Sequence, residues 1–151
     1  MYYVESPDTI EMGNRVSIFL AGGITNCPDW QAAIVDKIKH LELVIFNPRR
    51  KNFPIHDPTA AFAQIKWEHD HFRKSSMISF WFSKETMCPI VLYELGAWTM
   101  TDIPIVIGMD PAYQRRQDVE IQTKLERPDI KIVYSLGDLA EGITNLYNML
   151  T

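Results

Sequence analysis

The sequence has only two cysteines, no long apolar run and no extended stripe of basic residues. Cys27 and Cys88 are too few for a disulfide scaffold and form no CxxC motif, so we expect both to be reduced thiols. Neither has an evident histidine partner, which argues against a catalytic cysteine. No apolar segment approaches the roughly 20 residues of a membrane span, and the N-terminal residues lack the basic and apolar regions of a signal peptide. These absences predict a soluble, cytoplasmic protein without a membrane partner.

The charge balance and the glycine pattern exclude further classes. The formal net charge is -4 and the sequence pI is about 5.5, with basic residues scattered along the chain. Proteins that bind the nucleic-acid backbone concentrate basic residues on one face, so no nucleic-acid partner is expected. Neither GxGxxG nor GxxxxGK[ST] occurs, which disfavours a dinucleotide fold of the usual kind and a P-loop. The length of 151 residues fits one ordinary domain, covering residues 1–151.

What the sequence does contain is a regular alternation of apolar runs and segments with helical periodicity. Five apolar runs predict strands, at residues 16–21, 43–46, 77–82, 103–108 and 130–134. Five segments predict helices, at residues 29–41, 59–74, 89–101, 115–125 and 136–150, while residues 2–5 form a short extended lead-in. This alternation is typical of an α/β fold with a parallel sheet. Right-handed crossovers then predict a three-layer, doubly wound, five-stranded sheet with strand order 2-1-3-4-5.

In that order the first and third strands are neighbours at the topological switch point, beyond which ligands bind. The loops that meet there are residues 22–25 and 83–89. Gly22 and Gly23 either form a plain tight turn or let the backbone approach a ligand closely. Trp30, near this turn, either belongs to the core or stacks on a flat ligand.

Glu94 is the carboxylate that the sequence makes most conspicuous. It lies about one turn into a helix that Pro89 begins, with Thr86 or Cys88 as the expected N-cap. Its neighbours Ile90, Val91, Leu92, Leu95, Ala97 and Trp98 leave little of this helix for water. Because burying a charge is costly, we interpret Glu94 as a functional carboxylate, with a structural ion pair or a narrow solvent-facing stripe as the alternative.

A second carboxylate can come from the helix that precedes the third strand. Ile65 and Phe72 are expected to mark its buried stripe, which puts Glu68 beside the core and Asp70 toward solvent. The histidines at positions 69 and 71 diverge on a helix and no ligand cluster accompanies them, so no metal site is predicted. On the helix that begins near Arg115, cations at the positive end of the dipole indicate a partner carboxylate, a ligand, a subunit contact or a solvated face.

Six short motifs spread over nearly the whole chain form a set. They are residues 19–24 (FLAGGI), 29–30 (DW), 47–50 (NPRR), 64–68 (QIKWE), 80–82 (FWF) and 93–96 (YELG). Together they resemble the nucleoside 2-deoxyribosyltransferase family, in its deoxyribosyltransferase-like branch. The resemblance implies a flavodoxin-like domain that exchanges the base of a 2-deoxyribonucleoside through a covalent sugar ester on a glutamate. Glu94 matches that nucleophile, and Glu68, or else Asp70, matches the acid that protonates the departing base.

The resemblance also implies a homo-oligomer, in which Arg115, Gln117 or Gln122 would contribute to the site of a neighbouring subunit. No cofactor is expected. The predicted substrate contacts lie in these motifs and in the loop before Glu94: Leu20, Ala21, Gly22, Gly23, Asp29, Trp30, Pro48, Arg49, Trp67 and Cys88. The chain departs from the better-studied branch at Ser76 and residues 83–88, where relatives carry aspartates. The sequence leaves three points open: the kind of base, whether the nucleoside carries a 5′-phosphate, and whether the acceptor is a base or water. A non-catalytic nucleotide-binding module and a flavin-binding domain are the alternatives.

Overall fold

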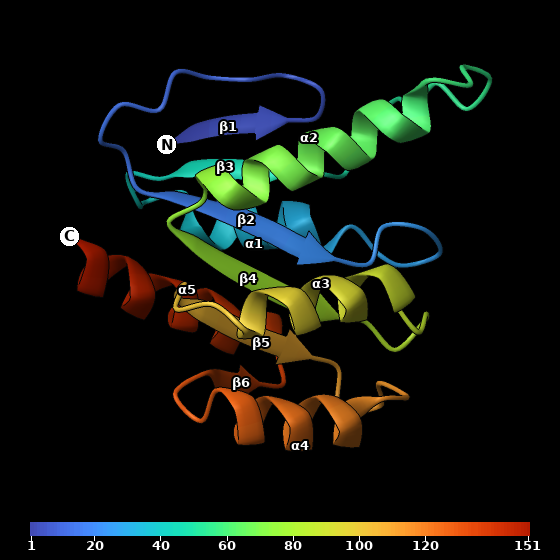
Figure 1. Ribbon diagram of the computed structural model, residues 1–151. Coiled ribbons are helices and arrows are strands. Elements are labelled where there is room, and N and C mark those ends of the chain that lie inside the picture. The colour runs from blue at the N-terminus through green and yellow to red at the C-terminus, as the bar shows by residue number, and fades with distance from the viewer.

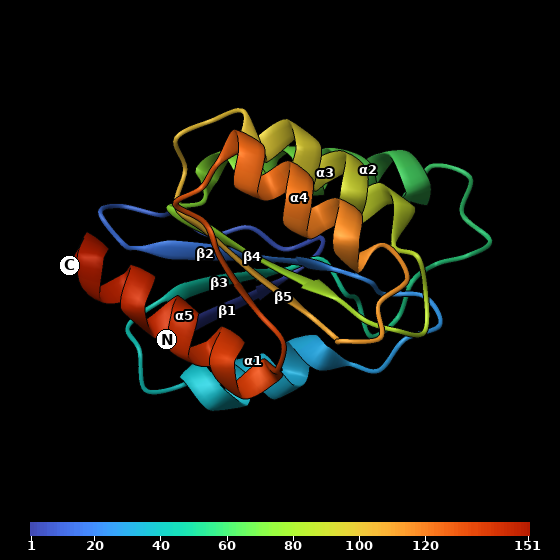
Figure 2. The same ribbon diagram turned by 90° about the horizontal axis from the view of Figure 1, so that it is seen from below.

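The computed structural model describes residues 1–151 and has one parallel sheet at its centre. The strands are β1 (Tyr2–Glu5), β2 (Ser17–Gly22), β3 (Val44–Asn47), β4 (Met77–Phe82), β5 (Ile105–Met109) and β6 (Lys131–Val133). The helices are α1 (Trp30–Ile38), α2 (Ala60–Lys74), α3 (Pro89–Thr99), α4 (Arg116–Glu126) and α5 (Leu136–Leu150). The sheet order is β1-β3-β2-β4-β5-β6 (Figure 1). Helices α2, α3 and α4 cover one face and α1 and α5 the other, as Figure 2 shows.

The predicted flavodoxin-like, doubly wound arrangement is confirmed, but the sheet has six strands rather than five. The extra strand is β1, which pairs in parallel with β3 from Tyr2 opposite Val44 to Glu5 opposite Asn47. Its sequence was expected to be only a lead-in because an edge strand needs no continuous apolar run. Tyr2 and Tyr3 are each 47% exposed, so the burial that marks the central strands is missing here.

Several element boundaries also differ from the prediction by up to three residues. The strand expected from residue 103 begins at Ile105, after Pro104, which has no N–H to give to a sheet ladder. The helix expected to run to residue 41 ends at Ile38. Its start is as predicted, since Asp29 is the N-cap and its carboxylate accepts a hydrogen bond from the Ala32 N–H at 3.1 Å. None of the helices has the length and apolar character that crossing a membrane requires.

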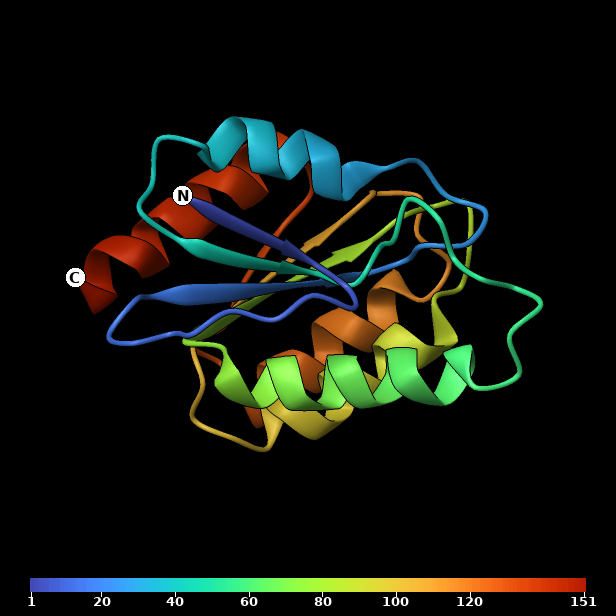
Figure 3. The same cartoon turned by 90° about the horizontal axis from the view of Figure 1, so that it is seen from above.

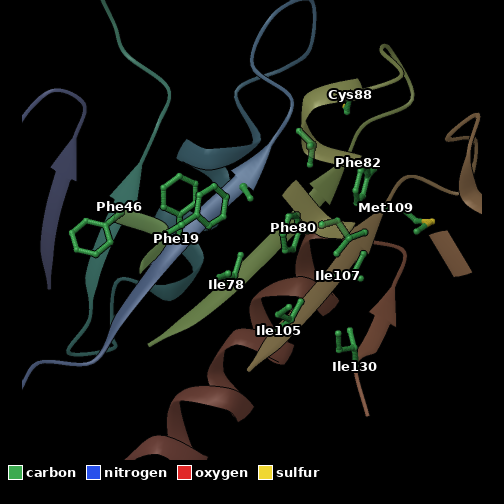
Figure 4. Close-up of a cluster of buried hydrophobic side chains, with 14 of the residues drawn as sticks. Phe19, Phe46, Ile78, Phe80, Phe82, Cys88, Ile105, Ile107, Met109 and Ile130 are labelled. Atoms are coloured by element: carbon green, nitrogen blue, oxygen red, sulfur yellow. The ribbon is translucent and has the colours of Figure 1, made fainter. Parts of the chain in front are cut away.

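Alternate residues of each strand build two separate cores. From β2, Phe19 and Ala21 face α2 and α3, whereas Ile18 and Leu20 face α1 and α5. Figure 4 shows the first of these clusters, with Phe19 and Phe46 on the neighbouring strands β2 and β3. Phe19 also stacks on Phe72 of α2, with ring centroids 3.8 Å apart. The residues of β2 on this face therefore point toward the helices that carry Glu68 and Glu94.

The expected buried stripe of α2 is wrong at Ile65, which is 64% exposed. The side chains that face the sheet are instead Trp67, His71 and Phe72. Two polar residues, Gln64 and His71, lie on the inward side and hid its phase in the sequence. The exposed Ile65 belongs to an apolar outer surface formed by α2, α3 and α4.

Candidate functional site

A cavity of about 270 Å³ opens beyond the carboxyl ends of β2 and β4, where the strand order reverses. The loops after β2, after β3 and before α3 gather at this end of the molecule, opposite the C-terminus (Figure 3). These loops form three walls of the cavity, and α2 and the first turns of α3 form the others. The lining residues are Phe19, Ala21, Gly22, Gly23, Ile24, Thr25, Pro48, Glu68, Thr86, Cys88, Pro89, Ile90, Val91 and Glu94.

Glu94 and Glu68 are the only charged residues in this lining, and both are partly buried. Burial, with a smaller contribution from the neighbouring charge of Glu68, raises the pKa of Glu94 to about 8. Burial also raises the pKa of Glu68, and a hydrogen bond from Gln64 partly offsets that effect. The cavity therefore favours holding one proton on its two carboxyls near neutral pH.

Gln64 fixes the position of Glu68. Its Nε2 donates to Glu68 Oε1 at 3.2 Å and to the Pro48 carbonyl at 2.9 Å, and its Oε1 accepts from Ser6 Oγ at 2.7 Å. Sequence reasoning placed Gln64 in a family motif but gave it no role. Its spacing of four residues from Glu68 on one helix is the signal that could have revealed the contact.

The start of α3 forms part of the cavity wall. Cys88 is the N-cap and Pro89 the first helical residue, as expected, and the side chain of Cys88 caps no backbone group. The first N–H groups of a helix have no partner within it, and the dipole favours negative charge there. Ile90 and Val91 line the cavity, so this turn is suited to hold an oxygen-rich group of a ligand. Tyr113 Oη donates to the Met87 carbonyl at 2.6 Å and steadies the loop before this turn.

Close packing accounts for Gly22, the last residue of β2, and for Gly23, which follows it. Neither has the positive φ that would make glycine necessary for a turn. A Cβ on Gly22 would overlap the indole of Trp30, and one on Gly23 would lie 3.0 Å from the sulfur of Cys27 and 3.1 Å from that of Cys88. The two glycines thus let the Trp30 indole and the two thiols pack closely against the end of β2.

Seven of the residues predicted from sequence meet in this cavity. They are the two carboxyls Glu68 and Glu94 with Ala21, Gly22, Gly23, Pro48 and Cys88. The remaining predicted residues lie elsewhere, and they fall into three groups.

Leu20, Trp30 and Trp67 are buried in the two cores. Leu20 points to the opposite face of the sheet from Glu94, because it alternates with the cavity-lining Phe19 and Ala21. Trp30 is 2% exposed, and its Nε1 donates to the Gly23 carbonyl at 3.0 Å, so it supports the cavity from behind. Trp67 packs against Phe19 and donates from Nε1 to the Asp8 carbonyl at 2.7 Å.

Asp29 and Arg49 brace the loop after β2 from outside the cavity. Their side chains form an ion pair, with Arg49 Nη1 3.2 Å from Asp29 Oδ1. Arg49 Nη2 donates to the carbonyl of Cys27 at 2.9 Å and also to that of Ile24. The pair therefore sets the course of the loop that carries Gly23 and Ile24.

Asp70 is not brought to the cavity. Its side chain is 41% exposed and forms an ion pair with Lys66 Nζ at 2.7 Å. A hydrogen bond from Lys66, with a smaller one from His69, lowers its pKa. Of the two acids considered on α2, only Glu68 shares the cavity with Glu94. Nowhere in the fold do three or more His, Cys, Asp or Glu side chains gather so as to hold a metal ion.

Several lining residues were not among the predicted contacts: Phe19, Ile24, Thr25, Thr86, Pro89, Ile90 and Val91. Most of them lie in or beside the two loops that the strand order predicted to meet. Phe19 could have been found from the two-residue period of β2, since it lies on the same side as Ala21.

A comparison with known families matches residues 15–113 to the model described as nucleoside 2-deoxyribosyltransferase like. The matched segment covers well over half of the chain and extends from just before β2 to Tyr113. It includes both carboxyls, Gln64 and every residue that lines the cavity. No curated protein matches the chain.

Proposed function

Because the chain belongs to the nucleoside 2-deoxyribosyltransferase-like family, we propose that it transfers 2-deoxyribose between nucleobases, or releases it to water, through an ester on Glu94. One observation carries this proposal: Glu94 and Glu68 face one cavity whose environment favours one shared proton near neutral pH. Glycosyl transfer with retention needs one ionised carboxylate as nucleophile and one protonated carboxyl as acid. The pair supplies that combination.

In the first half-reaction, the Glu94 carboxylate attacks C1′ of the sugar as the bond from C1′ to the base nitrogen breaks. The bonding electrons go to the base, which takes a proton from Glu68. In the second half-reaction, the nitrogen of an incoming base, or a water molecule, attacks C1′ and gives its proton back to Glu68. The ester bond breaks and the Glu94 carboxylate is restored.

Burial raises the pKa of Glu94 to about 8, so Glu94 is mostly protonated at neutral pH while the cavity is empty. Glu94 has to lose this proton before it can attack, and Glu68 is the neighbouring carboxyl that can receive it. The hydrogen bond from Gln64 stabilises Glu68 in its ionised form and so affects how readily this transfer occurs.

The charge of the lining supports an uncharged nucleoside as the substrate. The cavity contains two carboxyls and no Lys, Arg or His side chain. A 5′-phosphate would bring further negative charge beside these carboxyls, and like charges close together are unfavourable. We therefore expect deoxynucleosides to react faster than their 5′-phosphates.

Covalent trapping tests the proposal directly. The intact mass of the protein is measured after incubation with a panel of deoxynucleosides, together with release of free base. Wild type should gain the mass of a deoxyribosyl group, and Glu94→Gln should gain none. Glu68→Gln should form the adduct more slowly, whereas Asp70→Asn, an acid on the same helix outside the cavity, should match wild type.

Base release that persists in Glu94→Gln would refute the ester on Glu94. Nucleoside binding by wild type without base release or an adduct from any deoxynucleoside would instead indicate a non-catalytic binding module. A circular-dichroism spectrum of each variant shows whether its fold is intact.

We further propose that the chain forms a homo-oligomer through the outer surface of α2, α3 and α4. This surface exposes large apolar side chains: Phe62, Ile65, Ile90, Tyr93, Met100, Ile121 and Leu125. A groove of about 530 Å³ between α3 and α4 lies on the same side, with Arg115 and Gln122 in its lining. Ile90 belongs both to this surface and to the cavity lining. A second copy on the surface would therefore shield the cavity from water.

The oligomeric state is measured by light scattering after size exclusion. Tyr93 is 79% exposed on α3, and Met149 is equally exposed on α5 at the opposite face. Tyr93→Glu should dissociate the assembly, and Met149→Glu should leave it unchanged. A monomeric wild type, or equal effects of the two substitutions, would refute this interface.

A further inference from the structure

The only two cysteines of the chain lie on the two loops that frame the cavity, and both approach the same glycine. A Cβ on Gly23 would lie 3.0 Å from Cys27 Sγ and 3.1 Å from Cys88 Sγ. Since both sulfurs lie so close to one point, they are no more than about 6 Å apart. Gly23 has no side chain to separate them. Cys88 also lines the cavity, and Figure 4 shows it at the start of α3, beyond the end of β4 that carries Phe82.

Contacts outside the cavity hold the two loops that carry the thiols. Arg49 Nη2 donates to the Cys27 carbonyl at 2.9 Å and lies 4.0 Å from Cys27 Sγ. On the other loop, Tyr113 holds the carbonyl of Met87, the residue before Cys88. Both loops are thus held in place by contacts at Cys27 or beside Cys88.

The backbone of Cys88 is an independent sign that its side chain is used. Cys88 has a φ of 53°, in the left-handed region that residues other than Gly, Asn and Asp rarely adopt. Its thiol caps no N–H group of α3, a task that Ser, Asp or Asn performs better at this position. Neither backbone conformation nor capping explains a cysteine here, and strained residues are concentrated at functional positions.

We propose that Cys27 and Cys88 form a reversible dithiol–disulfide site that closes the cavity when it is oxidised by hydrogen peroxide. Cys27 is half-buried and Cys88 is buried, so Cys27 meets the oxidant first. Its thiol attacks the peroxide, the O–O bond breaks, and a sulfenic acid and one water form. The Cys88 thiol then attacks this sulfur, the S–O bond breaks, and a second water leaves. Two thiols lose two electrons and two protons, and hydrogen peroxide is reduced to two waters.

Burial raises the pKa of the Cys88 thiol, which suits its place as the second thiol to react. Formation of the bond brings the sulfurs to about 2.05 Å from each other. The loop after β2 and the loop before α3 must therefore move together over Gly23. Residues on both loops line the cavity, Ile24 on one and Thr86 on the other, so this movement narrows the cavity at its mouth.

The first test follows the chemistry by mass, and it does not depend on the proposed function. The reduced full-length protein is treated with dilute hydrogen peroxide and digested without reductant. Wild type should lose the mass of two hydrogen atoms and yield one linked peptide that contains both cysteines. Cys27→Ser and Cys88→Ser should yield no linked peptide. Reaction of the two thiols as separate sulfinic acids, without a linked peptide, would overturn the proposal.

The second test follows closure of the cavity, with deoxynucleoside binding measured by calorimetry, and this readout rests on the proposed function. Oxidised wild type should lose binding and regain it with dithiothreitol. Cys27→Ser, whose sulfur lies outside the cavity lining, should bind equally before and after peroxide. Amide hydrogen exchange at residues 22–25 and 86–92 gives a readout without nucleoside, and it should slow in the disulfide form. Linked peptides with unchanged exchange and unchanged binding would overturn the closure.

Discussion

Gln64 and Glu68 lie one turn apart on α2, and the Gln64 side-chain amide donates a hydrogen bond to Glu68 Oε1 across 3.2 Å. The same amide nitrogen is held by the Pro48 carbonyl, and its oxygen by the hydroxyl of Ser6. A donor to a carboxylate favours the ionised form, so Gln64 acts against the burial that raises the pKa of Glu68. The protonation of the proposed acid therefore depends on a neutral side chain held by two other segments.

Gln64→Leu should raise the pKa of Glu68 further, because burial would remain and the hydrogen bond would be lost. We expect the pH dependence of kcat/KM to move to higher pH on the limb that Glu68 governs, with a lower maximum because the carboxyl is less well oriented. The measurement is the pH profile of base exchange. Gln114→Leu, at an exposed position, is the control. An unchanged profile in Gln64→Leu would show that Gln64 has no influence on the acid.

Glu94→Gln should stabilise the protein at alkaline pH. The pKa of Glu94 is about 8 in the folded protein against an ordinary value of 4.5, so the folded state binds this proton more tightly than the unfolded state does. The stability of wild type therefore falls as the pH rises from about 4.5 through 8. Above pH 8 the buried carboxylate is ionised and destabilising, and a neutral amide avoids that cost.

Thermal unfolding at pH 5 and pH 9 checks this expectation. The melting temperature of Glu94→Gln should exceed that of wild type by several degrees at pH 9, since about 1 kcal/mol corresponds to ~2–4 °C at this size. At pH 5 the two proteins should differ little. An equal difference at both values would mean that ionisation of Glu94 is not the cause.

His71 should make the protein sensitive to acid. It is 2% exposed, and its Nδ1 lies 2.7 Å from the Trp67 carbonyl, while its Nε2 has no partner. Burial lowers its pKa below the ordinary 6.5, so the unfolded state binds the proton more readily. The contribution of neutral His71 to the free energy of unfolding is therefore fully present above about pH 6.5, and it is lost as the pH falls through the pKa of the folded state.

Urea unfolding between pH 5 and pH 7 measures this contribution. His71→Phe keeps an aromatic ring where His71 stacks on Trp67, with centroids 4.0 Å apart, and removes the titrating group. Its free energy of unfolding should change less over this range than that of wild type. His69→Phe, at an exposed neighbouring position, should keep the wild-type slope.

Gly22→Ala should destabilise the fold by about 1–3 kcal/mol, the usual effect of overpacking a core. The added Cβ would overlap the Trp30 indole and approach the Trp81 carbonyl to 2.7 Å. The control is Gly137→Ala in the first turn of α5, where the nearest atom is 3.9 Å from a new Cβ. That change should be neutral or stabilising by up to ~1 kcal/mol, because alanine loses less backbone entropy in a helix. Equal effects in denaturant titrations would contradict the packing role of Gly22.

The order of the five strands other than β1 could be predicted because the apolar runs of most of them are continuous and their crossovers have one hand. The same order predicted which two loops would meet, and Glu68 and Glu94 do share the cavity there. The edge strand β1 was missed because its two exposed tyrosines give no apolar run.

The direction in which a side chain points was harder to predict than the segments that lie near the cavity. Leu20 and Trp30 are near the cavity in sequence but point into the α1-α5 core, which a motif alone does not reveal. Asp29 and Arg49 satisfy each other's charge instead of facing the cavity. On α2, the inward-facing polar residues Gln64 and His71 hid the phase of the helix, and with it the exposure of Ile65.

The edge strand also affects how the protein can be shortened or tagged. β1 lies outside the segment that matches the family, yet it leads directly to Ser6, which holds the amide oxygen of Gln64. A version that begins at residue 15, where the family segment begins, would keep both carboxyls but lose that anchor and leave β3 as an unprotected sheet edge. An affinity tag for purification therefore belongs at the C-terminus, far from the cavity, where it disturbs neither contact.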